Sequence, residues 1–233
     1  MSALRIVLLG PPGAGKGSLA SLCSIRLGLE HISTGEMFRR EMARRSPLGR
    51  RVQRYVASGR LVPDALVVQV MARRLDRRTL RRGAVLDGFP RTAGQAAGLD
   101  RVLTQRGAPL DGAIYLAAEQ TLLVRRLSGR RVCGRCGTNY NIRTMRPKRA
   151  GTCDRCHGPL TTRRDDRPET IRKRLAIDRR VATPLLRYYQ RRGCLYRLNA
   201  SGSIEAMFAR SLGLFRRRGW LSNHDRAEER RRA

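Results

Sequence analysis

Short apolar runs, separated by stretches with helical spacing, recur along the chain. They lie near residues 4–9, 29–33, 84–87, 113–117 and 195–199. The first run, LRIVLL, is rich in branched aliphatic residues, which is typical of a strand buried on both faces of a parallel sheet. Because strands that alternate with helices assemble into parallel sheets, the pattern predicts an α/β fold with a doubly wound sheet.

A glycine-rich loop follows the first run directly. Residues 10–18 read GPPGAGKGS, and the next stretch, LASLCSIRLG, has the spacing of a helix that stops at Gly28. A phosphate-binding loop requires this order of strand, loop and helix, because backbone N–H groups then turn toward the phosphates. Gly17 interrupts the pattern G-x-x-x-x-G-K-[ST], so Ser18 is the candidate hydroxyl near Mg²⁺. We expect nucleotide binding, with Lys16 reaching the outer phosphates.

A candidate acidic residue ends the run at 84–87. The stretch AVLDGFPRT places Asp87 at the end of a predicted buried strand. An acid at this position can face the phosphate loop and hold Mg²⁺ through water. Taken singly, Asp87 could equally cap a helix or turn, and Arg91 could be one more surface arginine.

Four of the six cysteines lie close together in the sequence. Their spacing, Cys133-x2-Cys136-x16-Cys153-x2-Cys156, is typical of a structural zinc site with four thiolate ligands. Four thiolates complete a tetrahedron and leave no open position for a catalytic water. We therefore expect a structural Zn²⁺ that stabilises a small lobe, and the rival interpretation is a zinc ribbon that binds nucleic acid. His157 follows the last cysteine and could substitute for a ligand, but four cysteines suffice, so it is expected at the surface or beside the ligands.

Charge and composition limit the function classes. The formal net charge is +32, and lysine occurs only at 16, 148 and 173, so 47 of the 50 basic residues are arginine. This excess is spread along the chain, which favours solvated arginine-rich faces over a specific nucleic-acid site, although weak binding to polyanions at low salt is expected.

No apolar run approaches the roughly 18–20 residues that cross a membrane. The glycine-rich loop leaves no room for a signal peptide, so a cytoplasmic protein is expected, with Cys23 and Cys194 as packing residues.

Together, these blocks resemble adenylate kinases, a nucleoside monophosphate kinase family. GPPGAGKGS, HISTGEMFRR, DGFPRT, LSGRRVCGRCG, TTRRDD and ATPLLRYY occur in the family's order between Arg5 and about Gly202. The resemblance implies a five-stranded parallel sheet with a P-loop NTP-binding core, in a long form with a zinc-binding lid. It divides the chain into a core (1–32, 63–128 and 167–221), an AMP-binding insertion (33–62), a lid (129–166) and a disordered basic tail (222–233). A monomer is expected.

The implied reaction is the reversible transfer of the γ-phosphoryl group of Mg-ATP to AMP, giving two ADP. Such a transfer needs in-line positioning and positive charge more than covalent help from the protein. The resemblance assigns catalysis to Lys16, Asp87, Arg91, Arg130, Arg163 and Arg174. It assigns ATP binding to Gly13, Ala14, Gly15, Lys16, Gly17, Ser18, Arg126, Arg130, Asn139, Tyr140 and Gly202. It assigns AMP binding to Thr34, Arg39, Arg60, Leu61, Val62, Gly88, Phe89, Pro90, Arg91, Gln95, Arg163 and Arg174.

The identity of the two bases is left open by the sequence. The amide of Gln95 can pair with an adenine edge, and Thr92 fits adenylate kinases better than UMP/CMP kinases, which tend to have asparagine there. A GTP donor and a UMP or CMP acceptor stay as alternatives. The chain also departs from the family pattern at Pro63, where Ser or Thr is common, and at Asp178, near a site often occupied by tyrosine. Asp165 and Asp166 are expected to engage ATP or to pair with arginines.

Overall fold

The structure is a computed structural model that describes residues 3–58 and 60–221. The predicted disordered tail at 222–233 lies outside the described residues. Within the described ranges, none of the helices combines the length and the apolar character needed to cross a membrane.

A five-stranded parallel sheet forms the centre of the fold. Its strands are β1 (Arg5–Leu9), β2 (Glu30–Ser33), β3 (Ala84–Asp87), β4 (Gly112–Ala117) and β8 (Leu195–Asn199), in the order β2-β3-β1-β4-β8. Each apolar run in the sequence forms one strand, which confirms the predicted sheet. In the register of the sheet, Leu8 lies beside Asp87 on one side and Ile114 on the other. The loop that follows β1 and the acid that ends β3 therefore meet at the carboxyl edge of the sheet.

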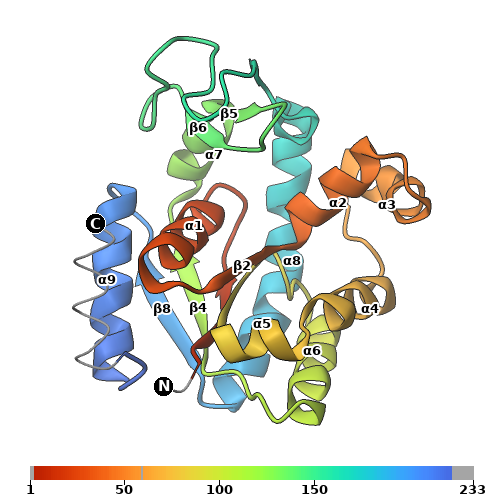
Figure 1. Cartoon of the computed structure of the whole chain (residues 1–233), viewed down its shortest axis with the longest axis vertical. Helices are drawn as coiled ribbons and strands as arrows, with labels where there is room; N and C mark the ends of the chain where they lie inside the picture. Colours follow the sequence, from red (N-terminus) through yellow and green to blue (C-terminus); the bar gives the residue numbers. More distant parts are fainter. Residues whose placement is uncertain (1–2, 59, 222–233) are drawn as a thin grey trace.

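Helices cover both faces of this sheet (Figure 1). They are α1 (Lys16–Leu27), α2 (Thr34–Ala43), α3 (Pro47–Ala57), α4 (Asp64–Arg74), α5 (Arg77–Arg82), α6 (Ala93–Gln105), α7 (Gln120–Ser128), α8 (Pro168–Arg191) and α9 (Ile204–Arg217). Ile6 and Leu8 of β1 pack with α1 and α9, whereas Val7 and Leu9 pack with α4 and α6. All four side chains are at most 3% exposed, and full burial of such a side chain contributes about 1.5–3 kcal/mol. This alternation anchors the strand whose end carries the glycine-rich loop.

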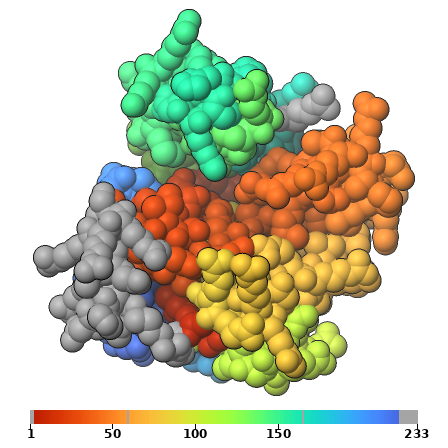
Figure 2. Space-filling model, viewed as in Figure 1, coloured from red at the N-terminus to blue at the C-terminus, as the bar shows by residue number. Residues whose placement is uncertain are grey.

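Two lobes extend beyond the sheet (Figures 1 and 2). Helices α2 and α3 form one lobe, between β2 and α4. The other lobe lies between α7 and α8 and contains an antiparallel sheet with the order β6-β5-β7, formed by β5 (Arg130–Cys133), β6 (Asn139–Asn141) and β7 (Leu160–Thr161). A 3-10 turn, η1 (Arg164–Asp166), joins this lobe to α8. Small cores built on few strands bury little apolar area, so the second lobe needs another source of stability.

Candidate functional site

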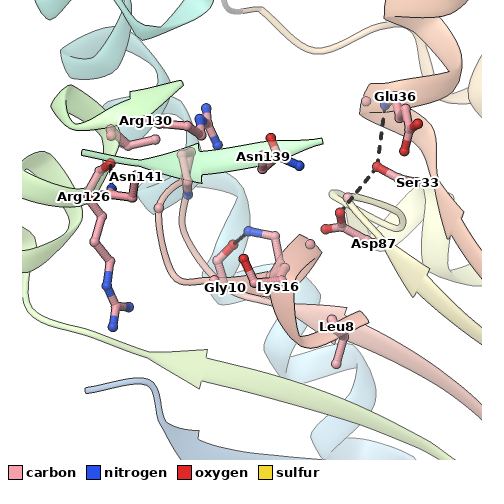
Figure 3. Close-up of a pocket in the computed structure, with 18 of the residues that line it drawn as sticks. Leu8, Gly10, Lys16, Ser33, Glu36, Asp87, Arg126, Arg130, Asn139 and Asn141 are labelled. Carbon is pink, nitrogen blue, oxygen red and sulfur yellow. Dashed lines mark hydrogen bonds between the residues drawn. The ribbon is translucent and has the colours of Figure 1, made fainter. Parts of the chain in front are cut away.

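A cavity of about 1090 Å³ opens at the carboxyl edge of the sheet, beneath the lobe of β5–β7 (Figure 3). Most residues predicted for the site line it: Gly13, Gly15, Lys16, Gly17, Ser18, Arg39, Asp87, Gly88, Pro90, Arg91, Arg126, Arg130, Asn139, Tyr140, Arg163, Arg174 and Gly202. Seven predicted residues do not line the cavity: Ala14, Thr34, Arg60, Leu61, Val62, Phe89 and Gln95. The side chains of Ala14, Val62 and Phe89 are buried in the core, and Arg60 is exposed.

The glycine-rich loop takes a conformation that other residues would strain. Gly13 and Gly15 have φ angles of 87° and 96°, and a Cβ on Gly13 would lie 2.9 Å from the carbonyl oxygen of Leu123. Gly15 directly precedes α1, so the N-terminal N–H groups of this helix lie at the cavity, where they favour an anion. The sequence prediction of a loop between strand and helix is confirmed.

Lys16 lies at the floor of the cavity, with its ammonium group turned back onto the loop (Figure 3). Its Nζ donates hydrogen bonds to the carbonyl oxygens of Gly10 at 2.5 Å and Pro11 at 2.9 Å. Burial lowers the pKa of Lys16 to about 8, although Asp87 and Asp178 favour its charged form. An anion beside Nζ would restore the charge that burial disfavours.

Asp87 lies at the end of β3, as predicted, and its surroundings keep it ionised. Ser33 Oγ donates to Asp87 Oδ2 at 3.2 Å, and His31 Nε2 lies 3.8 Å from the same oxygen. Burial on its own raises the pKa of Asp87, but His31 and the charges of Lys16 and Arg91 outweigh burial and hold the pKa below its usual value. Sequence reasoning missed His31 and Ser33, although their position at the end of a predicted strand was a usable signal.

The residues near Asp87 fit a magnesium ion. A Cβ on Gly17 would lie 3.2 Å from Asp87 Oδ2, so glycine at this position lets the loop approach the carboxylate closely. Ser18 follows and also lines the cavity. Hydroxyl and carboxylate oxygens are the ligand types that Mg²⁺ prefers.

Two aspartates hold the arginines that descend from the second lobe and α8. Asp166 is buried and accepts hydrogen bonds from Nε of Arg130 at 2.6 Å, from Nη2 of Arg130, and from Nη1 of Arg174 at 3.0 Å. Arg174 Nη1 also lies 3.0 Å from Asp165 Oδ2. The two aspartates therefore pair with arginines, one of the two alternatives that the sequence left open.

The cations around the cavity exceed their carboxylate partners. Burial, together with the nearby charges of Arg130 and Arg39, lowers the pKa of Arg163 to about 9. Burial likewise lowers the pKa of Arg91 and Arg39. Nε of Arg163 and Nη1 of Arg126 are buried and have no hydrogen-bond partner among the described residues. Buried donors of this kind are rarely left unpaired, so the site fits a ligand with several anionic oxygens.

The residues predicted for the acceptor base form a hydrogen-bonded network behind the cavity. Gln95 is buried; its Oε1 accepts from Arg91 N and its Nε2 donates to Asp64 Oδ1, both at 2.8 Å. Thr92 Oγ1 donates to Asp64 Oδ2 at 2.6 Å and also caps α6. These two bonds use one N–H and one lone pair of the Gln95 amide. Sequence reasoning missed Asp64, which was visible only as an acid in the first turn of a helix.

The cysteine cluster in the second lobe has the geometry of a metal site. The sulfur atoms of Cys133, Cys136, Cys153 and Cys156 all lie within 4.8 Å of one another. Two separations are 3.4 and 3.5 Å, close to the roughly 3.8 Å edge of a tetrahedron with Zn–S bonds of about 2.3 Å. The four residues therefore fit Zn²⁺.

Neighbouring groups support the cluster. Burial opposes ionisation of Cys153, but hydrogen bonds from the Tyr140 hydroxyl and from backbone N–H groups lower its pKa to about 6. The Tyr140 hydroxyl in turn accepts from Asp154 N at 2.8 Å. The tyrosine ring thus supports the cluster as well as bordering the cavity. His157 is exposed, as predicted.

Comparison with known proteins agrees with this geometry. The family model described as adenylate kinase matches residues 8–194. An adenylate kinase of Moorella thermoacetica is 43% identical over 213 residues, which cover 90% of this chain and 98% of the relative. Adenylate kinases of Thermosipho melanesiensis and Clostridium tetani are 41% and 40% identical, covering 92% and 88% of this chain and 100% and 95% of the relatives.

Proposed function

The chain belongs to the adenylate kinase family, and from that premise we propose which of its residues carry out phosphoryl transfer between ATP and AMP. The observation that supports the assignment most strongly is the convergence of cations with unpaired buried donors on one cavity. Phosphoryl transfer spreads negative charge over the transferred oxygens, and fixed cations lower its barrier without moving. Each lost contact of this kind costs about 10²–10³ in rate.

On the donor side, the loop holds the phosphates of ATP. The N–H groups at the start of α1 and the ammonium of Lys16 contact them, after Lys16 leaves the carbonyl oxygens of Gly10 and Pro11. Arg126 donates through Nη2 to the carbonyl oxygen of Gly202 at 3.0 Å, so these two residues border the same part of the cavity. The ATP base is proposed to lie between them, with Asn139 and Tyr140 above.

On the acceptor side, Arg39 and Arg91 hold the AMP phosphate. The Arg91 side chain is fixed by a hydrogen bond from its Nε to the Gly88 carbonyl oxygen at 2.8 Å, and Thr34 donates to the same oxygen at 2.9 Å. The remaining donor and acceptor of Gln95 pair with the base, and the backbone at residues 60–62 completes the pocket. Arg130, Arg163 and Arg174 surround the phosphoryl group between the two nucleotides.

Two ions assist in different ways. Adenylate kinases use Mg²⁺ with ATP, and Asp87 and Ser18 would hold it here; the ion neutralises phosphate charge. Zn²⁺ at the four cysteines stabilises the second lobe, because coordination and folding of that lobe are coupled. The zinc ion takes no part in the chemistry, since four thiolate ligands leave it no open position.

The two lobes are proposed to close over the nucleotides, residues 33–62 over AMP and residues 129–166 over ATP. They approach each other across the cavity, since a Cβ added to Gly137 would lie 3.5 Å from Glu36 Oε1. Closure excludes water, which would otherwise accept the phosphoryl group. We further propose a cytoplasmic monomer without a specific nucleic-acid site, whose charge gives only weak polyanion binding at low salt.

The base specificity is tested by measuring ADP formation with ATP or GTP as donor and AMP, CMP, UMP or GMP as acceptor. The proposal expects ATP with AMP to be the fastest pair by a clear margin. A faster rate with CMP or UMP would favour the alternative acceptor, and a faster rate with GTP would favour the alternative donor.

A further inference from the structure

One carboxylate in the cavity, that of Asp178, has no hydrogen-bond or ion-pair partner among the described side chains and no role in the proposed phosphoryl transfer. Helix α8 turns one face toward the cavity, on which Arg174, Asp178, Ala182 and Leu185 lie at intervals of three to four residues. Asp178 is half-buried on this face, one turn beyond Arg174. Asp178 therefore lines the cavity within electrostatic reach of Lys16, Arg91 and Arg174.

Asp178 differs from the other aspartates around the cavity because each of those has a hydrogen-bond or ion-pair partner. Asp87 accepts from Ser33, while Asp165 and Asp166 pair with arginines. Among the side chains that the structure describes, those of residues 3–58, 60–163 and 165–221, Asp178 finds no hydrogen bond or ion pair, and only the longer-range charges of Lys16, Arg91 and Arg174 act on it. A carboxylate that is partly removed from water and left without a donor costs stability, so a functional reason for it is expected.

The charges that act on Asp178 come from both nucleotide subsites. Lys16 belongs to the proposed donor subsite, Arg91 to the acceptor subsite, and Arg174 to the position between them. Burial raises the pKa of Asp178, whereas these three cations favour its ionised form. A negative charge at this point opposes the binding of phosphate groups in either subsite.

We propose that Asp178 weakens the binding of phosphate-bearing nucleotides in this cavity and thereby speeds the release of ADP. The inference rests on the proposed assignment of Lys16 and Arg91 to the two phosphate sites. The cavity carries many cations in a chain of net charge +32, which favour retention of phosphate-bearing products, and the carboxylate of Asp178 opposes that effect. Affinity that is equal for ground state and transition state does not raise turnover, and release of product is the slow step in many enzymes with closing lobes.

The test compares Asp178→Asn with Glu169→Gln in the zinc-loaded, full-length protein. Glu169 is exposed in the first turn of the same helix, so its variant makes the same change of net charge outside the cavity. Calorimetric titration measures the dissociation constants of AMP, ADP and adenosine, the last being an uncharged probe. One unit charge at about 8 Å and an effective dielectric constant of about 40 corresponds to about fivefold in affinity.

The proposal expects Asp178→Asn to bind AMP and ADP about fivefold more tightly at low salt, with a smaller gain at high salt because of screening. Adenosine affinity should stay constant, Glu169→Gln should match the wild type, and both the KM values and kcat of Asp178→Asn should fall, because ADP then leaves more slowly. Unchanged AMP and ADP affinities would overturn the proposal. Weaker binding with a lower kcat would also overturn it, since Asp178 would then serve to hold Lys16 and Arg91. Failure of the wild type to bind AMP would instead contradict the proposed function.

Discussion

Replacement of Asp166 by asparagine tests how the lobe of β5–β7 is attached to the core. The Asp166 side chain is fully buried, and three N–H groups of Arg130 and Arg174 donate to it. Asparagine keeps the shape, so no cavity forms, but the negative charge disappears and two half-buried guanidinium groups lose their main partner. Loss of one member of a buried ion pair costs about 3–5 kcal/mol. For a chain of this size each kcal/mol lowers Tm by about 2–4 °C, so we expect a decrease of roughly 6–20 °C.

The control is Arg82→Gln, which breaks a single, partly exposed ion pair. Arg82 Nη1 lies 4.0 Å from Glu30, and the Arg82 side chain is 60% exposed. Exposed pairs contribute only about 0–1 kcal/mol, so its Tm should stay within a few degrees of the wild type. Thermal and urea unfolding of the three proteins at neutral pH give the comparison. If Asp166→Asn melted no lower than Arg82→Gln, the inferred anchoring role of Asp166 would be refuted.

Three further predictions concern the site. Lys16→Met and Arg91→Ala should each lower kcat by about 10²–10³ in protein that stays folded by circular dichroism, and near-normal turnover would show that the phosphate site is elsewhere. Purified protein should hold about one zinc per chain, and Cys153→Ser should lower Tm while leaving residual activity at low temperature; a zinc-free protein with an unchanged melting curve would contradict this. Burial lowers the pKa of Lys16 to about 8, so kcat/KM for ATP should fall as the pH rises through about 8. The fall in kcat should come at a higher pH, because bound phosphates favour the charged lysine. A kcat/KM profile that is flat to about pH 10 would contradict this prediction.

The elements that could be predicted from the sequence are those whose formation depends on residues close together in the chain. Each apolar run became a strand because branched residues such as those at 6–9 can be buried on both faces of a sheet. The loop at residues 10–18 and the cysteine spacing were equally predictable, since each depends on few neighbouring residues.

The features that could not be predicted depend on contacts between residues that are distant in the sequence. Asp64 reaches Gln95 and Thr92 only because α4 packs against α6. The Tyr140 hydroxyl turns toward Cys153 because the lobe folds around the sulfur cluster. Asp178 was visible as a departure from the family pattern, but the pairing of Arg174 with Asp165 and Asp166 instead of Asp178 was not. Spacing alone does not show which of several charged residues will pair.

The most direct test of the account follows the phosphoryl group itself. ATP labelled in its γ-phosphate is incubated with magnesium and AMP, and the products are separated. We expect AMP-dependent appearance of label in the β-phosphate of ADP, with little labelled inorganic phosphate, because the closed cavity excludes water. Label that appears mainly as inorganic phosphate, or that stays in ATP when AMP is present, would contradict it.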